Sequence, residues 1–287
     1  MLWEQYARER KRVLSAAPFT PNPASWPGTG LHAAWLGHST VLIELDGMTI
    51  LTDPVFSDRA GLNLGPFTIG IKRLVKPALQ LPGAGSNEIP RPDLILLSHA
   101  HMDHFDLPSL RRLESKRTRV VTAAKTADLL RVKRFGGVDE LAWGESVRIG
   151  DIGVRAFEVN HWGARMQSDT YRGFNGYLIE TPRHRVLFGG DTALTGTFRQ
   201  LRSSRRLDLA IMPIGAYNPW IHAHCTPEQA LRMADDAGAE FILPVHHQTF
   251  QLGREPRHEP IERLSSALAS APGRLALREI GQELHLD

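Results

Sequence analysis

Short apolar runs separated by turn-forming residues make up most of the chain, and this pattern is typical of strands in an α/β protein. The pair Asp46-Gly47 lies between two such runs and predicts a hairpin. The clearest helix begins at Thr226, a capping residue followed by Pro227. We predict strands at residues 32–36, 40–45, 49–52, 93–98, 119–122, 146–149, 154–159, 176–180, 186–188, 209–212, 241–245, 275–280 and 283–286. We predict helices at residues 1–14, 107–115, 124–132, 226–237 and 259–271.

Two segments depart from this alternation. Residues 1–30 combine the charged helix with a proline-rich stretch, and we expect an arm packed on a single domain that spans residues 31–287. Residues 54–92 form a 39-residue insertion, rich in glycine and proline, whose secondary structure is ambiguous. Loops of this length are usually functional, and the apolar content argues against disorder. The insertion is therefore interpreted either as a substrate-covering loop or as a structural insertion.

Composition excludes several classes of protein. The 287 residues contain 34 Lys and Arg against 31 Asp and Glu, without a long basic run, so no nucleic-acid partner is expected. A single cysteine excludes an internal disulfide and fits a reducing compartment. No stretch approaches the roughly 20 apolar residues of a membrane span. The charged first ten residues lack the apolar centre of a signal peptide, so we expect a cytoplasmic location.

A dense cluster of potential metal ligands follows the predicted strand at residues 93–98. His99, His101, Asp103 and His104 fall within six residues, and imidazole and carboxylate suit zinc and related metals. Because one metal needs three or four protein ligands, this cluster can begin two adjacent sites. The alternative is a surface histidine cluster without a metal.

Three further candidates, His161, Asp191 and His246, each follow a predicted strand. A lone histidine at a strand end is more often a hydrogen-bonding residue than a ligand. Sheets of α/β proteins nevertheless gather their sites at strand ends, so the recurrence of His or Asp at four such ends favours one shared centre.

Taken together, these motifs resemble those of metallo-β-lactamase-fold hydrolases. The resemblance implies a four-layer αβ/βα sandwich and a centre with two zinc ions, with manganese or iron as alternatives. It also implies that one metal binds His99, His101 and His161, that the second binds Asp103, His104 and His246, and that Asp191 bridges them.

A closer resemblance, from about residue 18 to residue 250, is to the N-acylphosphatidylethanolamine phospholipase D-like branch. It is carried by four segments, Trp35-Leu36-Gly37-His38-Ser39-Thr40, Leu51-Thr52-Asp53-Pro54, Pro213-Ile214-Gly215-Ala216-Tyr217 and Val245-His246-His247-Gln248-Thr249-Phe250. The branch has a further site histidine before a Pro-Glu helix start, and this implies a catalytic role for His224. Where the branch has His-Trp-Gly, this chain has His246-His247-Gln248, a departure that bears on lipid specificity.

Other residues support weaker hypotheses. Asp53 follows a strand and is predicted to hold a ligand histidine from behind, although it could simply form the turn before Pro54. His38 either reaches the edge of the site or bonds to backbone. His222 and His247 either contact substrate or are polar neighbours only.

The predicted function is therefore hydrolysis, with a phosphodiesterase of the phospholipase D type favoured. A hydroxide shared by the two metals would attack phosphorus, with Asp103 and Asp191 among the catalytic residues and His224 aiding the leaving oxygen. The expected partner is an anionic small molecule or lipid-like substrate, with which peripheral membrane contact is compatible.

Alternative functions use the same residues. The main one is hydrolysis of a lactone, carboxylic ester or amide, and a non-catalytic metal-binding protein is the third. Cys225 lies outside the position of the cysteine ligand found in one β-lactamase subgroup. Diiron members of the superfamily have a carboxylate where this chain has His101, which disfavours redox chemistry.

Overall fold

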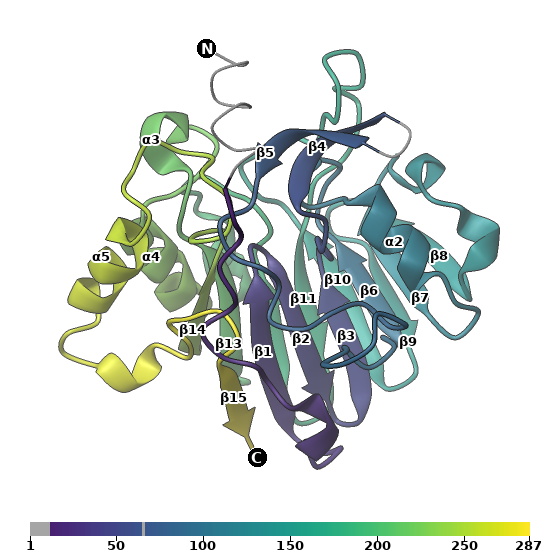
Figure 1. Ribbon diagram of the computed structural model, residues 1–287. Helices are drawn as coiled ribbons and strands as arrows, with labels where there is room; N and C mark the ends of the chain where they lie inside the picture. The colour runs from purple at the N-terminus through teal and green to yellow at the C-terminus, as the bar shows by residue number, and fades with distance from the viewer. Residues whose placement is uncertain (1–11, 65–66) are drawn as a thin grey trace.

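The computed structural model describes residues 12–64 and 67–287, and within them two large sheets face each other (Figure 1). The first sheet has the order β15 (Glu283–Leu286), β1 (Leu31–Gly37), β2 (Thr40–Leu45), β3 (Met48–Thr52), β6 (Leu94–Leu97), β7 (Arg119–Ala123) and β8 (Gly137–Leu141). The second has the order β14 (Ala239–Val245), β13 (Leu207–Pro213), β12 (Arg185–Phe188), β11 (Gly176–Glu180), β10 (Ile152–Phe157) and β9 (Ser146–Ile149).

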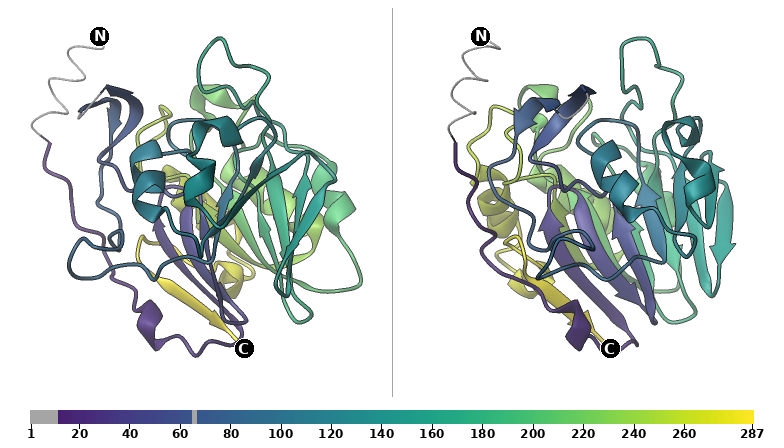
Figure 2. Two further views of the ribbon diagram at one scale, coloured as in Figure 1. Left: turned by 90° about the vertical axis from the view of Figure 1, so that its right-hand side faces the viewer. Right: turned by 45° about the vertical axis from the view of Figure 1, so that its right-hand side comes forward.

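Helices lie outside the two sheets, which gives the four layers. Helices α4 (Pro227–Ala237) and α5 (Glu259–Ala267) cover the second sheet, whereas α2 (Leu107–Leu113) lies on the side of the first (Figure 2). Strand β13 is buried on both faces, as expected for a strand between layers. Its Leu209 and Ile211 belong to the main core with residues of both sheets, and Ala210 and Met212 pack with α4 and α5.

The direction of the strands brings their carboxyl ends to one edge of each sheet. In the first sheet β1, β3 and β6 run in the same direction, because β1 and β3 are both antiparallel to β2 and β3 is parallel to β6. In the second sheet β10, β12, β13 and β14 share a direction. Polar residues that directly follow these strands are therefore gathered at common edges.

Most of the predicted elements are present, but two are wrong. Residues 124–132 form two short 3₁₀ turns, η2 (Ala127–Leu129) and η3 (Val132–Arg134), rather than a helix. Lys125 has a φ of 60°, and Glu140 accepts hydrogen bonds from the first amides after it, so a regular helix cannot continue through this turn. Residues 275–280 contain only an isolated bridge from Leu275 to Ile242.

Other boundaries differ less. Strand β8 was not predicted, and the helix expected at 259–271 ends at Ala267. Of the helix expected at residues 1–14, residues 1–11 lie outside the described residues, and 12–14 are not helical. The remaining short elements are η1 (Pro23–Ser25), η4 (Thr197–Leu201), α3 (Tyr217–Trp220) and η5 (Pro272–Arg274). No helix among the described residues is long and apolar enough to cross a membrane.

The insertion at residues 54–92 has more structure than a loop. It contains a hairpin of β4 (Arg59–Leu64) and β5 (Phe67–Lys72), which stands apart from both sheets (Figure 1). After the hairpin, the chain contributes Val75, Leu79 and Ile89 to the main core. Its first residues are tied to the segment after the histidine cluster, because Asp106 accepts hydrogen bonds from both the amide and the hydroxyl of Ser57.

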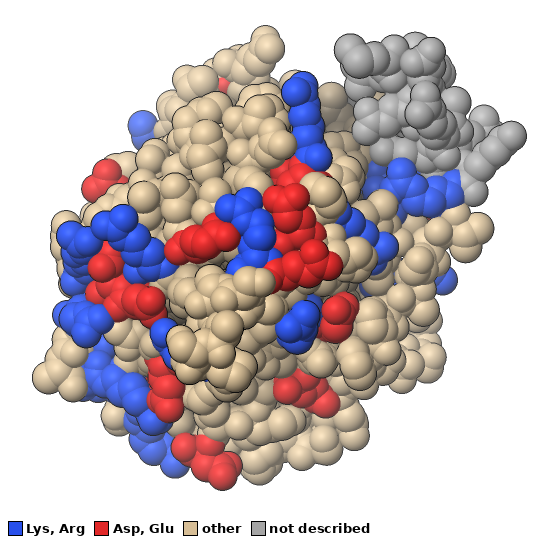
Figure 3. Space-filling view, turned by 90° about the vertical axis from the view of Figure 1, so that its left-hand side faces the viewer, with Lys and Arg blue, Asp and Glu red and all other residues tan. Residues whose placement is uncertain are grey.

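Charges on the outer helices are paired. On the side of the molecule where α4 and α5 lie, basic and acidic side chains alternate rather than forming a field of one sign (Figure 3). Arg263 of α5 is bonded to Glu228 of α4, and Arg274 is bonded to Asp235 at the end of α4. These pairs join α5 to α4 and tie Arg274 to the end of α4.

Candidate metal centre

The predicted ligands converge where the strand ends of the two sheets meet. His99 follows β6, Asp191 follows β12 and His246 follows β14, whereas His161 lies four residues beyond β10. Because the chain turns sharply after each strand, side chains remote in sequence face one another. These side chains form two adjacent groups of potential ligand atoms.

The first group contains only imidazoles. His99 Nε2 lies 2.8 Å from His101 Nδ1, and His161 Nε2 lies 3.3 Å from the same atom. The three ring nitrogens lie within 4.8 Å of one another, as expected for donors directed at a common point. This is the ligand set that the resemblance assigned to one metal.

The second group combines imidazoles with a carboxylate. Asp103 Oδ2 lies 3.5 Å from both His104 Nε2 and His246 Nε2. His38 joins this group, because its Nε2 lies 3.0 Å from the same oxygen. The structure thus brings together the three residues expected here and places His38 at the site rather than on backbone alone.

Asp191 lies between the two groups. Its Oδ2 is 3.1 Å from His104 Nε2, 3.1 Å from His246 Nε2 and 3.9 Å from His161 Nε2. One carboxylate oxygen is thus within reach of both groups, the arrangement that a bridging ligand requires.

Second-sphere hydrogen bonds orient the histidines. Asp53 Oδ2 lies 2.7 Å from His104 Nδ1, so His104 turns its Nε2 toward the centre. The Ser98 amide and hydroxyl donate to the same carboxylate, and the carbonyl of Ala223 accepts from His161 Nδ1 at 2.8 Å. Partners of this kind fix the ring orientation of metal-binding histidines.

The two groups differ in charge. Burial, with help from neighbouring histidines, holds the pKa of His99 well below its usual range, and burial lowers the pKa of His161 to about 3. For His246 burial acts in the same direction, but Asp191 and Asp103 outweigh it and raise its pKa to about 9. Burial disfavours ionised Asp191, yet His104 and His246 hold its pKa well below the usual range.

These properties fit metal cations. His104 Nε2, His246 Nε2 and Asp191 Oδ1 are buried and make no hydrogen bond of good geometry, an arrangement that is uncommon unless another partner binds. The carboxylates of Asp191 and Asp103 raise the pKa values of both His104 and His246, so this group favours positive charge beside the carboxylates. Metal binding replaces the protons that carry this charge, because ligand imidazoles must be neutral.

The catalytic candidate His224 lies beside Asp191. It is buried before α4, where Thr226 and Gln229 form a capping box, and its Nδ1 is 3.8 Å from Asp191 Oδ2. Burial lowers its pKa to about 4. The structure thus brings His224 to the centre.

His222 and His247, the other two histidines considered as substrate contacts, do not line the centre. His222 is exposed. Its ring lies near that of Trp220, with 6.3 Å between the ring centroids. His247 is buried and stacked on Trp35, with 4.5 Å between ring centroids. Both positions leave their proposed contact with substrate without support in the structure.

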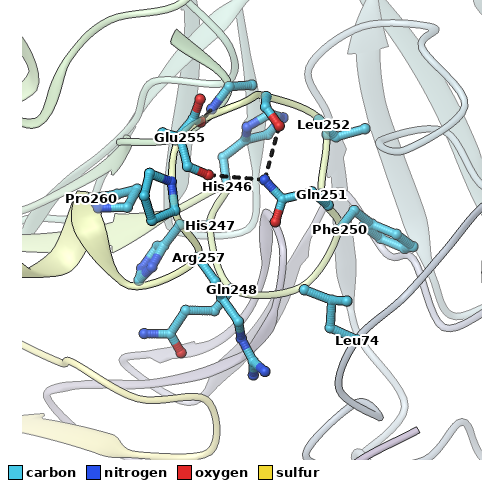
Figure 4. Close-up of a pocket in the computed structure, with 14 residues that line it drawn as sticks. Leu74, His246, His247, Gln248, Phe250, Gln251, Leu252, Glu255, Arg257 and Pro260 are labelled. Atoms are coloured by element: carbon cyan, nitrogen blue, oxygen red, sulfur yellow. Dashed lines mark hydrogen bonds between the residues drawn. The ribbon is translucent and has the colours of Figure 1, made fainter. Parts of the chain in front are cut away.

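The chain after His246 folds back into a tight loop that fixes this ligand candidate. Gln251 Nε2 donates to the carbonyls of Gly253 and Glu255 at 2.8 and 3.0 Å (Figure 4). The Glu255 carboxylate in turn accepts the amides of Ala216 and Asn218, beyond the end of β13. His246 itself is tied to the end of β1, because its amide donates to the carbonyl of His38 at 3.1 Å.

A cavity of about 200 Å³ opens over the centre. Its apolar walls are Trp162, Trp220 and Leu252, and His101, Asp103 and Asp191 are among the polar residues at its base. Trp162 also packs against His101, with 4.9 Å between ring centroids. No described residue of the 54–92 insertion lines this cavity, which favours the structural insertion over the substrate-covering loop of the two interpretations of this segment.

Two facing mixed sheets between outer helices, with a centre of histidines and aspartates at the strand ends, define the class of metal-dependent hydrolases with the metallo-β-lactamase fold. The chain belongs to this superfamily, because residues 48–247 match the beta-lactamase superfamily domain. The expected family and the αβ/βα sandwich are confirmed.

Relatives extend over most of the chain. It is 34% identical over 281 residues to an uncharacterised protein of Mycobacterium tuberculosis, with 93% of this chain and 72% of that one covered. It is 31% identical over 260 residues to N-acyl-phosphatidylethanolamine-hydrolyzing phospholipase D 1 of Caenorhabditis elegans, with 84% and 70% covered. A solved metallo hydrolase from the archaeon Ignicoccus hospitalis matches with a TM-score of 0.66 at 21% identity, covering 90% of this chain and 98% of that chain, and supports the fold.

Proposed function

We propose that this chain is a binuclear zinc phosphodiesterase that hydrolyses phosphodiesters of the N-acylphosphatidylethanolamine type. The observation that carries the proposal is the position of Asp191 Oδ2, 3.1 Å from two histidines of one group and 3.9 Å from a histidine of the other. One carboxylate within reach of two ligand groups is what a pair of metal ions would share, and such pairs support in-line displacement at phosphorus.

The proposed ligand sets follow the two groups. His99, His101 and His161 would hold one ion, and Asp103, His104 and His246 the other, with Asp191 shared. When bound, the two ions supply an activated water at neutral pH and stabilise charge on the phosphoryl oxygens.

The chain's own residues complete the site. Asp191 orients the attacking water, because its Oδ1 is buried without a hydrogen-bond partner. His224 Nδ1 also has no hydrogen-bond partner, so an imidazole N–H is available at the centre for an oxygen of the substrate. His38 holds Asp103 in place through its 3.0 Å contact.

The cavity favours a substrate with an apolar part. Trp162, Trp220 and Leu252 offer apolar walls directly beside the charged centre, which suits a phosphodiester attached to an acyl or aromatic group. The relative from C. elegans is named for hydrolysis of such a phospholipid. Contact of the exposed Trp162 and Trp220 with a lipid surface would then accompany catalysis.

The test measures metal content and reaction class together. We expect zinc-reconstituted protein to contain two ions per chain and to release phosphatidic acid from N-acylphosphatidylethanolamine in mixed micelles. Bis(p-nitrophenyl) phosphate serves as the soluble phosphodiester, beside a panel of lactones, carboxylic esters and amides. Turnover of that panel without any phosphodiester cleavage would overturn the proposal in favour of the ester-hydrolase alternative, and absence of all turnover in zinc-loaded protein would favour a binding function.

A further inference from the structure

The turn at residues 100–105, which carries His101, Asp103 and His104, is bridged by an arginine from another loop. Arg165 Nη1 lies 3.0 Å from the carbonyl oxygen of Ala100 and 2.8 Å from that of Phe105, and it donates to both. His101, Asp103 and His104 lie between these two carbonyls in sequence. A single guanidinium nitrogen therefore holds the two ends of the ligand turn together.

The side chains of the turn have partners of their own, but few other hydrogen bonds fix its backbone. Within it, the amides of His104 and Phe105 both donate to the carbonyl of His101, at 3.1 and 2.7 Å. Ala100 and Phe105 are fully buried, so no water replaces the guanidinium at their carbonyls without a rearrangement. The shape of the turn thus depends on Arg165.

The loop that carries Arg165 is itself anchored. Asp169 accepts from the amide of Met166 at 2.6 Å and from Arg172 Nε at 2.6 Å. Arg172 also donates to Asp128 and to the carbonyl of Lys125, which lie beyond β7. Arg165 therefore extends from a fixed support rather than from a free loop.

The same loop begins at another ligand candidate. His161 precedes it, and the chain returns to the cluster after it, because the Asn175 amide donates to the carbonyl of Ser98 at 2.9 Å. Arg165 thus joins two ligand-bearing segments, one from each sheet.

We propose that Arg165 is a positioning residue that preforms the metal site, holding the Ala100 and Phe105 carbonyls so that His101, Asp103 and His104 keep their ligand geometry before a metal arrives. The inference rests on the proposed metal centre, but not on the identity of the substrate. Preorganised ligands bind metal more tightly because less conformational freedom is lost on binding.

The experiment measures zinc affinity by chelator competition and amide exchange in metal-free protein. We expect Arg165→Ala to weaken zinc binding by roughly 10–100-fold, the range found for outer-shell partners of metal ligands. The amide of Phe105 should exchange faster in the metal-free variant. Added methylguanidinium should restore part of the zinc affinity, because it can occupy the space of the missing side chain.

The matched control is Arg172→Gln, which releases the anchor of the same loop without touching the ligand turn. Because Arg165 keeps its own bonds to the carbonyls of Ala100 and Phe105, we expect this variant to lose much less zinc affinity than Arg165→Ala. Equal losses in both variants, or a loss in Arg165→Ala that methylguanidinium does not reverse, would show that loop stability rather than Arg165 is responsible. Unchanged zinc affinity in Arg165→Ala would also overturn the inference.

A second variant, Arg165→Lys, tests the proposal in case Arg165→Ala does not fold. Arg165→Lys keeps the charge but replaces the planar guanidinium with a single ammonium. Weaker zinc binding at unchanged melting temperature supports the inference, and wild-type affinity contradicts it. Because the readouts are zinc affinity and amide exchange, loss of the proposed phosphodiesterase activity leaves the test intact. If the wild-type chain bound no zinc, exchange in the metal-free proteins would still decide the role of Arg165.

Discussion

The two ligand groups of the centre are built differently. His99, His101 and His161 have negative φ, and the Nε2 atoms of His99 and His161 lie 2.8 and 3.3 Å from His101 Nδ1. In contrast, His38 and His246 of the carboxylate group have φ values of 52° and 63°, in the left-handed region. Asp53, which supports His104, has a φ of 30°. Strained backbone is therefore confined to one side of the centre.

The left-handed residues show where the surrounding fold must hold the backbone of the site in an unfavourable conformation. A non-glycine residue in the left-handed region costs of order 1–2 kcal/mol, so it persists only where its surroundings fix it. His38, Asp53 and His246 each follow the end of a strand, and the Asp103 carboxylate belongs to the same group as His38 and His246. Both groups draw on the two sheets, since His161 follows β10 and His246 follows β14, but only the second group combines left-handed backbone with opposite charges.

Asp191 is the one residue on which both groups depend, so its replacement should have the largest effect. We expect Asp191→Asn to lower phosphodiester turnover by about a thousandfold or more, because a neutral amide stabilises neither the charged water nor both metals. Metal content should fall from two ions toward one. Steady-state kinetics and elemental analysis of zinc-loaded protein measure both effects.

The result also tests the comparison. If Asp191 belongs to both ligand groups, Asp191→Asn should lower the zinc affinity of both groups, although not by the same factor. Near-normal turnover, or full zinc content with unchanged affinity, would contradict the bridging role and leave the two groups independent.

His224 should show the second-largest effect. We expect His224→Ala to lower turnover roughly a hundredfold while two metals stay bound, since a positioned proton or hydrogen-bond donor contributes about 10²–10⁴-fold. The matched control is His222→Ala, because this exposed histidine lies two residues away and contacts no ligand. Equal activity in the two variants, or loss of metal in His224→Ala, would place His224 outside the proposed role.

Much of this centre could be predicted from the sequence, for a physical reason. Each of His99, Asp191 and His246 follows a buried strand closely, and strands of like direction gather such residues at one edge. Asp53 was predicted to hold a ligand histidine because it too follows a strand, and its contact with His104 agrees with that role.

The remainder depends on contacts that no local pattern encodes. His247 resembles a site residue in sequence, but the chain turns at His246 and stacks it on Trp35 instead. Arg165 was not singled out, because nothing near it indicates that its side chain meets Ala100 and Phe105 across the centre. The 3₁₀ turns at 124–132 depend on Glu140 of the unpredicted β8.

Replacing Asp53 tests the second ligand group alone, because Asp53 supports His104 of that group. We expect Asp53→Asn to weaken the second metal about 10–100-fold, the usual effect of changing an outer-shell carboxylate, because His104 loses its charged partner. The first metal should be affected less. Asp93→Asn is the matched control, because Asp93 precedes β6 at its opposite end and its carboxylate accepts from the Thr49 amide, away from the ligand candidates.

Stepwise zinc titration of the two variants gives the measurement. Two separable affinities in Asp53→Asn, with only one changed, would agree with the comparison. Parallel weakening of both affinities would mean that the groups are not separately supported.

The smallest effect concerns backbone strain beside the second group. Gln248 has a φ of 58° and makes one long hydrogen bond, from Nε2 to the carbonyl of Arg278 at 3.4 Å. The phospholipase D-like branch has glycine here, which adopts this conformation without steric cost. We expect Gln248→Gly to raise the free energy of unfolding by up to about 1 kcal/mol, with turnover unchanged. Gln248→Ala removes the same hydrogen bond but keeps the Cβ atom, so denaturant unfolding of the two variants isolates the strain. If glycine stabilised no more than alanine, the left-handed backbone at this position would not be strained.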